Sequence, residues 1–218
     1  MGQVKPFMTK EIKYDADCYV YLSISDRLVL FPQNATTAAV WDMEDGRSLG
    51  LLEGHTSNIV RASLNSIKTT AVTVSDDETN QVHPVKIWCL ETMQCTANLT
   101  TTFPFAKLLK DRLLLGSRDG PIKVWDVGGS TPVALMDLEG HTDCPWSIDA
   151  WDTSNVALSG SQDKSVRLWD LRTGQCVRVM EGHSNFVWSV SMDSACKTAV
   201  SGSYDLSLIH ISEPTRPY

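Results

Sequence analysis

Residues 139–170 read EGHTDCPWSIDAWDTSNVALSGSQDKSVRLWD, and this stretch decides the fold. Its last part alternates apolar and polar residues, with Arg167 between Val166 and Leu168, which predicts a half-buried β-strand. Turn-forming residues such as Thr173-Gly174 follow it, and Asp119-Gly120 and Asp45-Gly46 punctuate similar runs elsewhere. The pattern therefore predicts short β-strands joined by tight turns.

The same elements recur along the chain at a period in the low forties. Glu-Gly-His occurs at 53–55, 139–141 and 181–183, and the last two copies are 42 residues apart. A tryptophan followed by Asp or Cys occurs at positions 41, 88, 125 and 169, at intervals of 47, 37 and 44 residues. Two motifs that share a period indicate a repeat architecture, in which neighbouring units bury each other's faces.

The spacing of residues within each repeat is more constant than the spacing between repeats. A histidine, a hydroxyl residue 18 positions later and an aspartate 22 positions later occur in three copies: His55, Thr73 and Asp77; His141, Ser159 and Asp163; His183, Ser201 and Asp205. In two copies a tryptophan follows the turn aspartate by six residues, as Trp169 follows Asp163.

In these motifs the chain resembles the WD-repeat family over about Tyr14 to Asp205. The resemblance implies an all-β fold, a β-propeller of four-stranded antiparallel blades. We expect residues 1–205 to form a partial propeller of about four and a half blades out of about seven, because seven blades need about 300 residues. The repeats end near Trp41, Trp88, Trp125 and Trp169, and a truncated repeat covers 181–205.

The resemblance also implies a reason for the polar residues inside each blade. A tryptophan indole donates to the hydroxyl residue, which bonds the histidine, which in turn bonds the turn aspartate. The implied networks are Asp163–His141–Ser159–Trp169 and Asp77–His55–Thr73–Trp88, with His183, Ser201 and Asp205 as a third, partial copy. We expect these networks to stabilise the blades, each satisfied link by about 1 kcal/mol.

Ser, His and Asp together also occur in hydrolases, but three copies in repeat register argue against a single catalytic site. The chain has no GxSxG motif and no CxxC pair among its six cysteines. We therefore expect a non-enzymatic protein with free thiols and with no catalytic residue, metal or cofactor.

Two repeats depart from the pattern. The third has Thr101-Thr102 in place of Gly-His and Leu115 in place of the hydroxyl residue, so we expect apolar packing to hold that blade. The packing residues are Phe103, Phe105, Leu108, Leu113 and Leu115. The second carries an insertion at 78–84, which predicts that His83 is an exposed loop residue, with a role at a binding edge as the alternative.

The resemblance implies that a partner binds at one face of the propeller, the top face, near the start of each first strand and just before each turn aspartate. Those positions gather large aromatic and polar residues in the third to fifth repeats: Arg118, Cys144, Trp146, Gln162, Phe186, Trp188 and Tyr204. Trp, Tyr and Arg dominate binding hot spots. Packing between blades is the alternative for Trp146 and Trp188, and we expect Trp151 in the core.

The last thirteen residues break the repeat. Ile211 stands where a tryptophan is expected, and residues 206–216, LSLIHISEPTR, look like the translation of a transposase adapter used in sequencing libraries. We therefore expect residues 206–218 to be a non-native tail and the natural chain to continue past Asp205, with a divergent last strand of the repeat as the alternative.

The net charge of −7 argues against nucleic acid or an anionic membrane as partner, and no apolar run approaches the ~20 residues that span a bilayer. We expect an intracellular scaffold, in the cytoplasm or alternatively the nucleus, that binds a peptide or protein within a multiprotein complex. The alternatives are the substrate receptor of a ubiquitin ligase and the targeting module of a larger enzyme.

Overall fold

A computed structural model of the chain describes residues 23–25, 27–65, 69–76, 82–103 and 105–212. All regular structure in these residues is β-strand, arranged as five antiparallel sheets. No helix in this part of the chain is long and apolar enough to cross a membrane. The predicted all-β fold class is confirmed.

Each sheet is a meander of consecutive strands, and we call the sheets blades 1 to 5 in chain order. Blade 1 contains β1 (Ser23–Ser25), β2 (Leu28–Pro32), β3 (Thr37–Asp42) and β4 (Arg47–Glu53). Blade 2 contains β5 (Ile59–Leu64), β6 (Thr70–Ser75), β7 (His83–Cys89) and β8 (Gln94–Thr101). Blade 3 contains β9 (Ala106–Leu108), β10 (Arg112–Leu115), β11 (Ile122–Asp126) and β12 (Val133–Leu138). Blade 4 contains β13 (Pro145–Trp151), β14 (Val156–Ser161), β15 (Val166–Asp170) and β16 (Gln175–Met180). Blade 5 contains β17 (Val187–Met192), β18 (Thr198–Ser203) and β19 (Leu208–Ser212).

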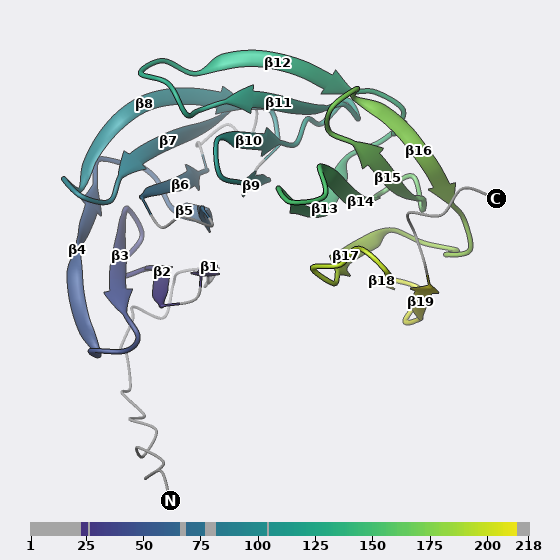
Figure 1. The fold of residues 1–218 in the computed structure, drawn as a ribbon, viewed down its shortest axis with the longest axis horizontal. Coiled ribbons are helices and arrows are strands. Elements are labelled where there is room, and N and C mark those ends of the chain that lie inside the picture. Colours follow the sequence, from purple (N-terminus) through teal and green to yellow (C-terminus); the bar gives the residue numbers. More distant parts are fainter. Residues whose placement is uncertain (1–22, 26, 66–68, 77–81, 104, 213–218) are drawn as a thin grey trace, which may run out of the picture.

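The blades follow one another around an open arc, with the first strand of each blade at the inside and the last at the outside (Figure 1). Blades 1 and 5 form the two ends of the arc (Figure 1). This arrangement of antiparallel blades, four of them four-stranded and the fifth three-stranded, is an incomplete β-propeller, as predicted.

Local sequence explains the hairpins within a blade. In β15 the side chains of Val166 and Leu168 are buried while Arg167 between them is half-buried. The turn before β15 places Lys164 at a φ of 71°, and the Asp163 carboxylate accepts the backbone N–H of Ser165 at 2.9 Å. Such side-chain-to-backbone bonds are the reason that aspartate favours turns.

Each pair of neighbouring blades encloses its own apolar cluster. Leu52 and Trp88 lie in the cluster between blades 1 and 2, and Val85 and Leu115 lie in the next. The cluster between blades 3 and 4 is the most aromatic and contains Phe103, Phe105 and Trp169. Leu158 and Val190 lie between blades 4 and 5. Burial of apolar surface therefore holds the arc together blade by blade.

Hydrogen bonds also join the innermost strands of neighbouring blades. A backbone N–H of one blade donates to a side chain of the preceding blade: Leu64 to Ser23 Oγ (2.9 Å), Leu108 to Ser63 Oγ (2.9 Å) and Met192 to Asp149 Oδ2 (2.9 Å). The three acceptors share one register position with two further residues, Lys107 and Ser191, and we call it the inner register position: Ser23, Ser63, Lys107, Asp149 and Ser191. Lys107 cannot accept a hydrogen bond, and its ammonium instead lies 3.0 Å from the Asp149 carboxylate.

Blade 5 continues past the predicted boundary at Asp205. Leu206 has a φ of 64° and is almost fully exposed, and β19 then pairs along β18 with Ile211 opposite Ala199. Residues 213–218 lie outside the described part of the chain. That the tail derives from a library adapter stays a prediction, which the nucleotide sequence of the transcript tests.

Candidate functional site

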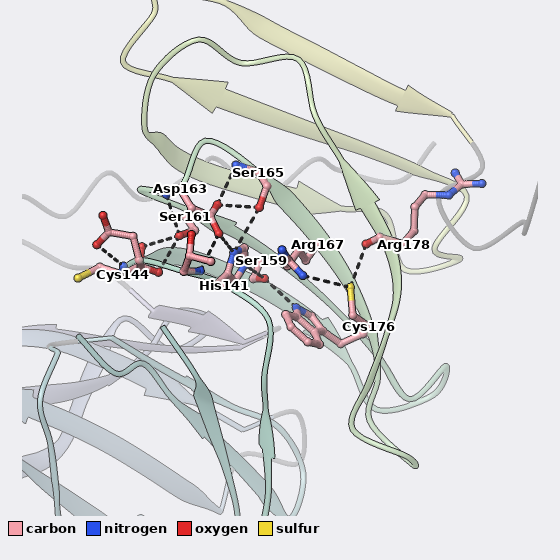
Figure 2. Close-up of polar contacts among 12 residues, drawn as sticks. His141, Cys144, Ser159, Ser161, Asp163, Ser165, Arg167, Cys176 and Arg178 are labelled. Atoms are coloured by element: carbon pink, nitrogen blue, oxygen red, sulfur yellow. Dashed lines mark hydrogen bonds and ion pairs between the residues drawn. The ribbon is translucent and has the colours of Figure 1, made fainter. Parts of the chain in front are cut away.

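Blade 4 contains a buried chain of four polar side chains, most of which Figure 2 labels. The indole N–H of Trp169 donates to Ser159 Oγ at 2.8 Å. The Ser159 hydroxyl is therefore left to donate to Nε2 of His141 at 2.6 Å, and Nδ1–H of His141 donates to Asp163 at 2.8 Å. These hydrogen bonds link β15, the turn before it and the loop before β13 to the second strand of the blade, β14.

The electrostatics of this chain favour an ionised aspartate. Burial alone would raise the pKa of Asp163, but hydrogen bonds from His141 and Ser165 outweigh it and hold the pKa well below its usual range. Ser159 has no exposed surface, and its hydroxyl oxygen already accepts the Trp169 indole N–H. This group of residues can stabilise the blade but cannot present a nucleophile to a substrate.

The other two copies are less complete. In blade 5, His183 contacts Ser201 at 2.9 Å and Asp205 at 3.1 Å, but Ile211 provides no indole donor. The aspartate carboxylate also accepts bonds from Ser207 and from backbone N–H groups, which hold the pKa of Asp205 well below its usual range.

In blade 2, His55 contacts Thr73 at 2.7 Å, and the Trp88 indole donates to Thr73 at 2.8 Å. Asp77, the expected partner of His55, lies outside the described residues. Burial and then the charge of Lys86 lower the pKa of His55 to about 4, so the imidazole is neutral at physiological pH.

Blade 3 has no such chain in the described residues, as its sequence indicates. Leu115 stands at the position of Ser159, and the buried indole nitrogen of Trp125 has no hydrogen-bond partner among the described residues. Thr102, which stands in place of the histidine, makes a smaller polar network: its Oγ1 lies 3.2 Å from Ser117 Oγ and accepts the N–H of Arg118. The five expected apolar residues are all buried: Phe103, Phe105, Leu108, Leu113 and Leu115.

Four aromatic side chains from blades 3, 4 and 5 form a continuous row, here called the aromatic row: Phe103, Trp146, Trp188 and Tyr204. Successive ring centroids are 4.8, 4.4 and 6.4 Å apart in that order. Phe103 meets Trp146 edge to face at 88°, and the later pairs are tilted by 51° and 46°. Such offset and tilted arrangements are the favourable ones for aromatic pairs.

Exposure increases along the aromatic row. Phe103 is buried and Trp146 half-buried, whereas Trp188 is 43% exposed and Tyr204 63% exposed. The indole N–H of Trp146 donates to Gln162 at 3.3 Å. The Trp188 indole and the Tyr204 hydroxyl have no side-chain or backbone partner within the described residues.

The remaining predicted partner-binding residues differ in how far they are exposed to solvent. Arg118 is exposed and Gln162 half-buried beside Trp146. Phe186 is half-buried, and its carbonyl accepts the N–H of Tyr204 at 2.9 Å. Cys144 is a correction: it is buried between blades 3 and 4, its thiol donates to the Arg118 carbonyl at 3.1 Å, and burial raises its pKa.

The row also includes a residue that sequence reasoning assigned to the core alone. Phe103 directly follows Thr102, where the shortened third repeat lacks its histidine, so the repeat spacing did not place it at the binding edge. Its position is visible only from the edge-to-face contact with Trp146.

Two other expectations are wrong. His83 is buried, not an exposed loop residue, because β7 begins there and pairs it with Thr101; its Nδ1 lies 3.3 Å from Asp76. Trp151 is 36% exposed, because it ends β13, and its indole donates to the Met192 carbonyl at 3.1 Å.

The described cysteines, Cys89, Cys95, Cys144, Cys176 and Cys196, are free thiols, and Cys18 lies outside the described residues. Among the residues with described positions, no group of three or more His, Cys, Asp or Glu side chains could hold a metal ion.

Comparison with known proteins gives matches to a repeat family and to several larger proteins. Relatives include CCR4-associated factor 4 homolog of Candida glabrata, 27% identical over 63% of this chain and 26% of that protein. Ribosome biogenesis protein YTM1 of Saccharomyces cerevisiae is 32% identical over 57% of this chain and 28% of its own length. Nuclear distribution protein PAC1 of Arthroderma benhamiae is 26% identical over 65% and 35%. The chain thus spans about a quarter to a third of the length of these relatives.

A family model described as "WD domain, G-beta repeat" matches residues 132–170 and 174–210. The first match runs from the end of blade 3 through β15, and the second from β16 through most of β19. The chain therefore carries WD40 repeats in its distal part, and its resemblance to the WD-repeat β-propeller family is confirmed.

Proposed function

We propose that this chain is a non-enzymatic scaffold that binds a peptide or protein partner at the aromatic row. Rigid repeat platforms carry their binding residues at loops and strand starts, and the exposed part of the row lies there: Trp188 is near the start of β17 and Tyr204 follows β18.

One observation carries the proposal. Trp188 and Tyr204 are large, exposed and in contact with one another, and they continue directly into the half-buried Trp146. Adjacent exposed aromatic rings on a soluble surface mark an interaction site, and Trp and Tyr contribute most per residue to binding energy. The buried end of the row holds the exposed end in place, so little side-chain entropy is lost on binding.

The names of the relatives support membership of an assembly. They include a CCR4-associated factor and a ribosome biogenesis protein. We propose by analogy that this chain also works within a multiprotein complex, in the nucleus or the cytoplasm.

A pull-down from cell extract tests the site. We expect Trp188→Ala combined with Tyr204→Ala to abolish partner capture while the thermal unfolding curve stays close to that of the wild type. Trp151→Ala is the matched control, because it removes another partly exposed tryptophan from blade 4, away from the row. Undiminished capture by the double variant would overturn the proposal.

A further inference from the structure

We propose that the aromatic row binds a proline-rich segment in the polyproline II conformation, flanked by basic residues. This inference rests on the proposed function and names the class of partner. It is carried by the spacing of the rings, by unused hydrogen-bond donors and by the charge around the row.

The length of the aromatic row from Trp146 to Tyr204 is close to one turn of a polyproline II helix. Centroids lie 4.4 Å apart from Trp146 to Trp188 and 6.4 Å apart from Trp188 to Tyr204. A polyproline II helix rises about 9 Å per three-residue turn, so one turn covers the three rings. The exposed parts of Trp188 and Tyr204 offer aromatic surface on which proline rings can stack.

The unused donors fit the backbone of the same ligand. Trp146 donates its indole N–H to Gln162, but in the next blade Tyr204 stands at the position of Gln162. The Trp188 indole N–H therefore has no acceptor among the described residues, and the Tyr204 hydroxyl also lacks one there. A polyproline II segment has no internal hydrogen bonds, so its carbonyls are free to accept from both groups.

The polar surroundings favour this ligand over an amphipathic helix. A helix lays a broad apolar face into a groove, whereas the polar side chain of Gln162 contacts Trp146 in the row. The exposed aromatic surface of the row is limited to Trp188 and Tyr204, which suits an extended segment.

The charge around the row favours basic flanks. The turns and loops at this edge of blades 3 to 5 carry more carboxylates than cations: Asp119, Asp143, Asp163 and Asp205 against Arg118 and Lys164. Hydrogen bonds hold the pKa values of Asp163 and Asp205 well below their usual range, so both are ionised at neutral pH. The net charge of −7 steers a basic segment toward the protein in the same sense.

Two displayed peptide libraries test the inference on the full chain. One fixes an Arg-flanked Pro-x-x-Pro pattern with random residues between, and the other replaces each fixed proline by alanine. We expect the wild type to enrich clones from the proline library alone. We expect Trp188→Ala to weaken a selected peptide about thirty-fold and Trp188→Phe, which keeps a ring but loses the N–H, about three- to ten-fold.

Trp151→Ala again serves as the matched control and should bind the peptide as the wild type does. Equal enrichment from the two libraries, or binding that does not depend on Trp188, would overturn the inference. If extract capture depends on Trp188 and Tyr204 while no proline preference emerges, this inference fails and the proposed function stands. If neither extract capture nor peptide binding depends on Trp188, both the proposed function and this inference fail.

Discussion

At the scale of single residues, His141 is hydrogen-bonded through both ring nitrogens and is buried in blade 4. Alanine at this position leaves Asp163 as a buried charge without its main partner, so we expect His141→Ala to lower the free energy of unfolding by about 3 kcal/mol. Thermal unfolding followed by circular dichroism measures the change. His210→Ala is the control, because His210 is exposed on β19. A melting temperature equal to that of the wild type would contradict a structural role for His141.

Burial of His55 makes the free energy of unfolding depend on pH in a direction that can be predicted. Its pKa of about 4 in the folded protein lies below the value of about 6.5 in an unfolded chain. The unfolded chain therefore binds more protons between these values, and the stability that neutral His55 contributes is complete above about pH 6.5 and falls toward about pH 4.

Urea unfolding near neutral pH and about two pH units lower measures this effect. We expect His55→Gln, whose side chain does not titrate, to lose less stability across the interval than the wild type does. An equal loss in both proteins would show that His55 is not held neutral by its burial.

At the scale of elements, the bonds between innermost strands give a comparison at one register position. Ser63 accepts the buried N–H of Leu108, so Ser63→Ala orphans that group, and we expect a loss of about 1–3 kcal/mol. Ser191 occupies the same position in blade 5, is exposed and makes one side-chain contact, at 3.4 Å to Asp149. Ser191→Ala should therefore change the free energy of unfolding by a few tenths of a kcal/mol at most. Equal urea midpoints for the two variants would contradict this account.

Fixed spacing within the repeat explains what the sequence could predict at this scale. The 18- and 22-residue offsets place a histidine opposite its hydroxyl residue and its aspartate, and the distances in blades 4 and 5 follow from them. The start of β7 at His83 could not be predicted because it lies within the insertion at 78–84. Turn residues precede both loops and strand starts, so the sequence does not distinguish the two.

The inner register position was not found in the sequence for a different reason. Its residues recur at the repeat period but alternate between hydroxyl, cationic and anionic types, so residue identity does not repeat although the backbone contact does. Only the pairing of each strand with its neighbour shows that these side chains face the following blade.

At the scale of the whole molecule, the open arc leaves one apolar face of blade 5 without a neighbour among the described residues. Leu208 and Val200 are 72% and 36% exposed, whereas Val166 and Leu158, at the same register positions in blade 4, are fully buried. We expect Leu208→Lys with Val200→Thr to reduce concentration-dependent association of the chain, measured by light scattering. Val179→Lys with Val177→Thr, on the outer strand β16, is the matched control. Equal association of all three proteins would show that this face of blade 5 does not mediate the association.

Three bonds between innermost strands run from a backbone N–H to a side chain of the preceding blade, whereas Lys107 and Trp151 donate to the following blade. Each blade is thus joined to the next by bonds that need both blades in place, and blades that emerge in order from the ribosome can dock one at a time. Removal of an end blade exposes the former partners to water, which can replace these bonds. The cost of shortening the molecule therefore comes mainly from the apolar surface that the end blade covered.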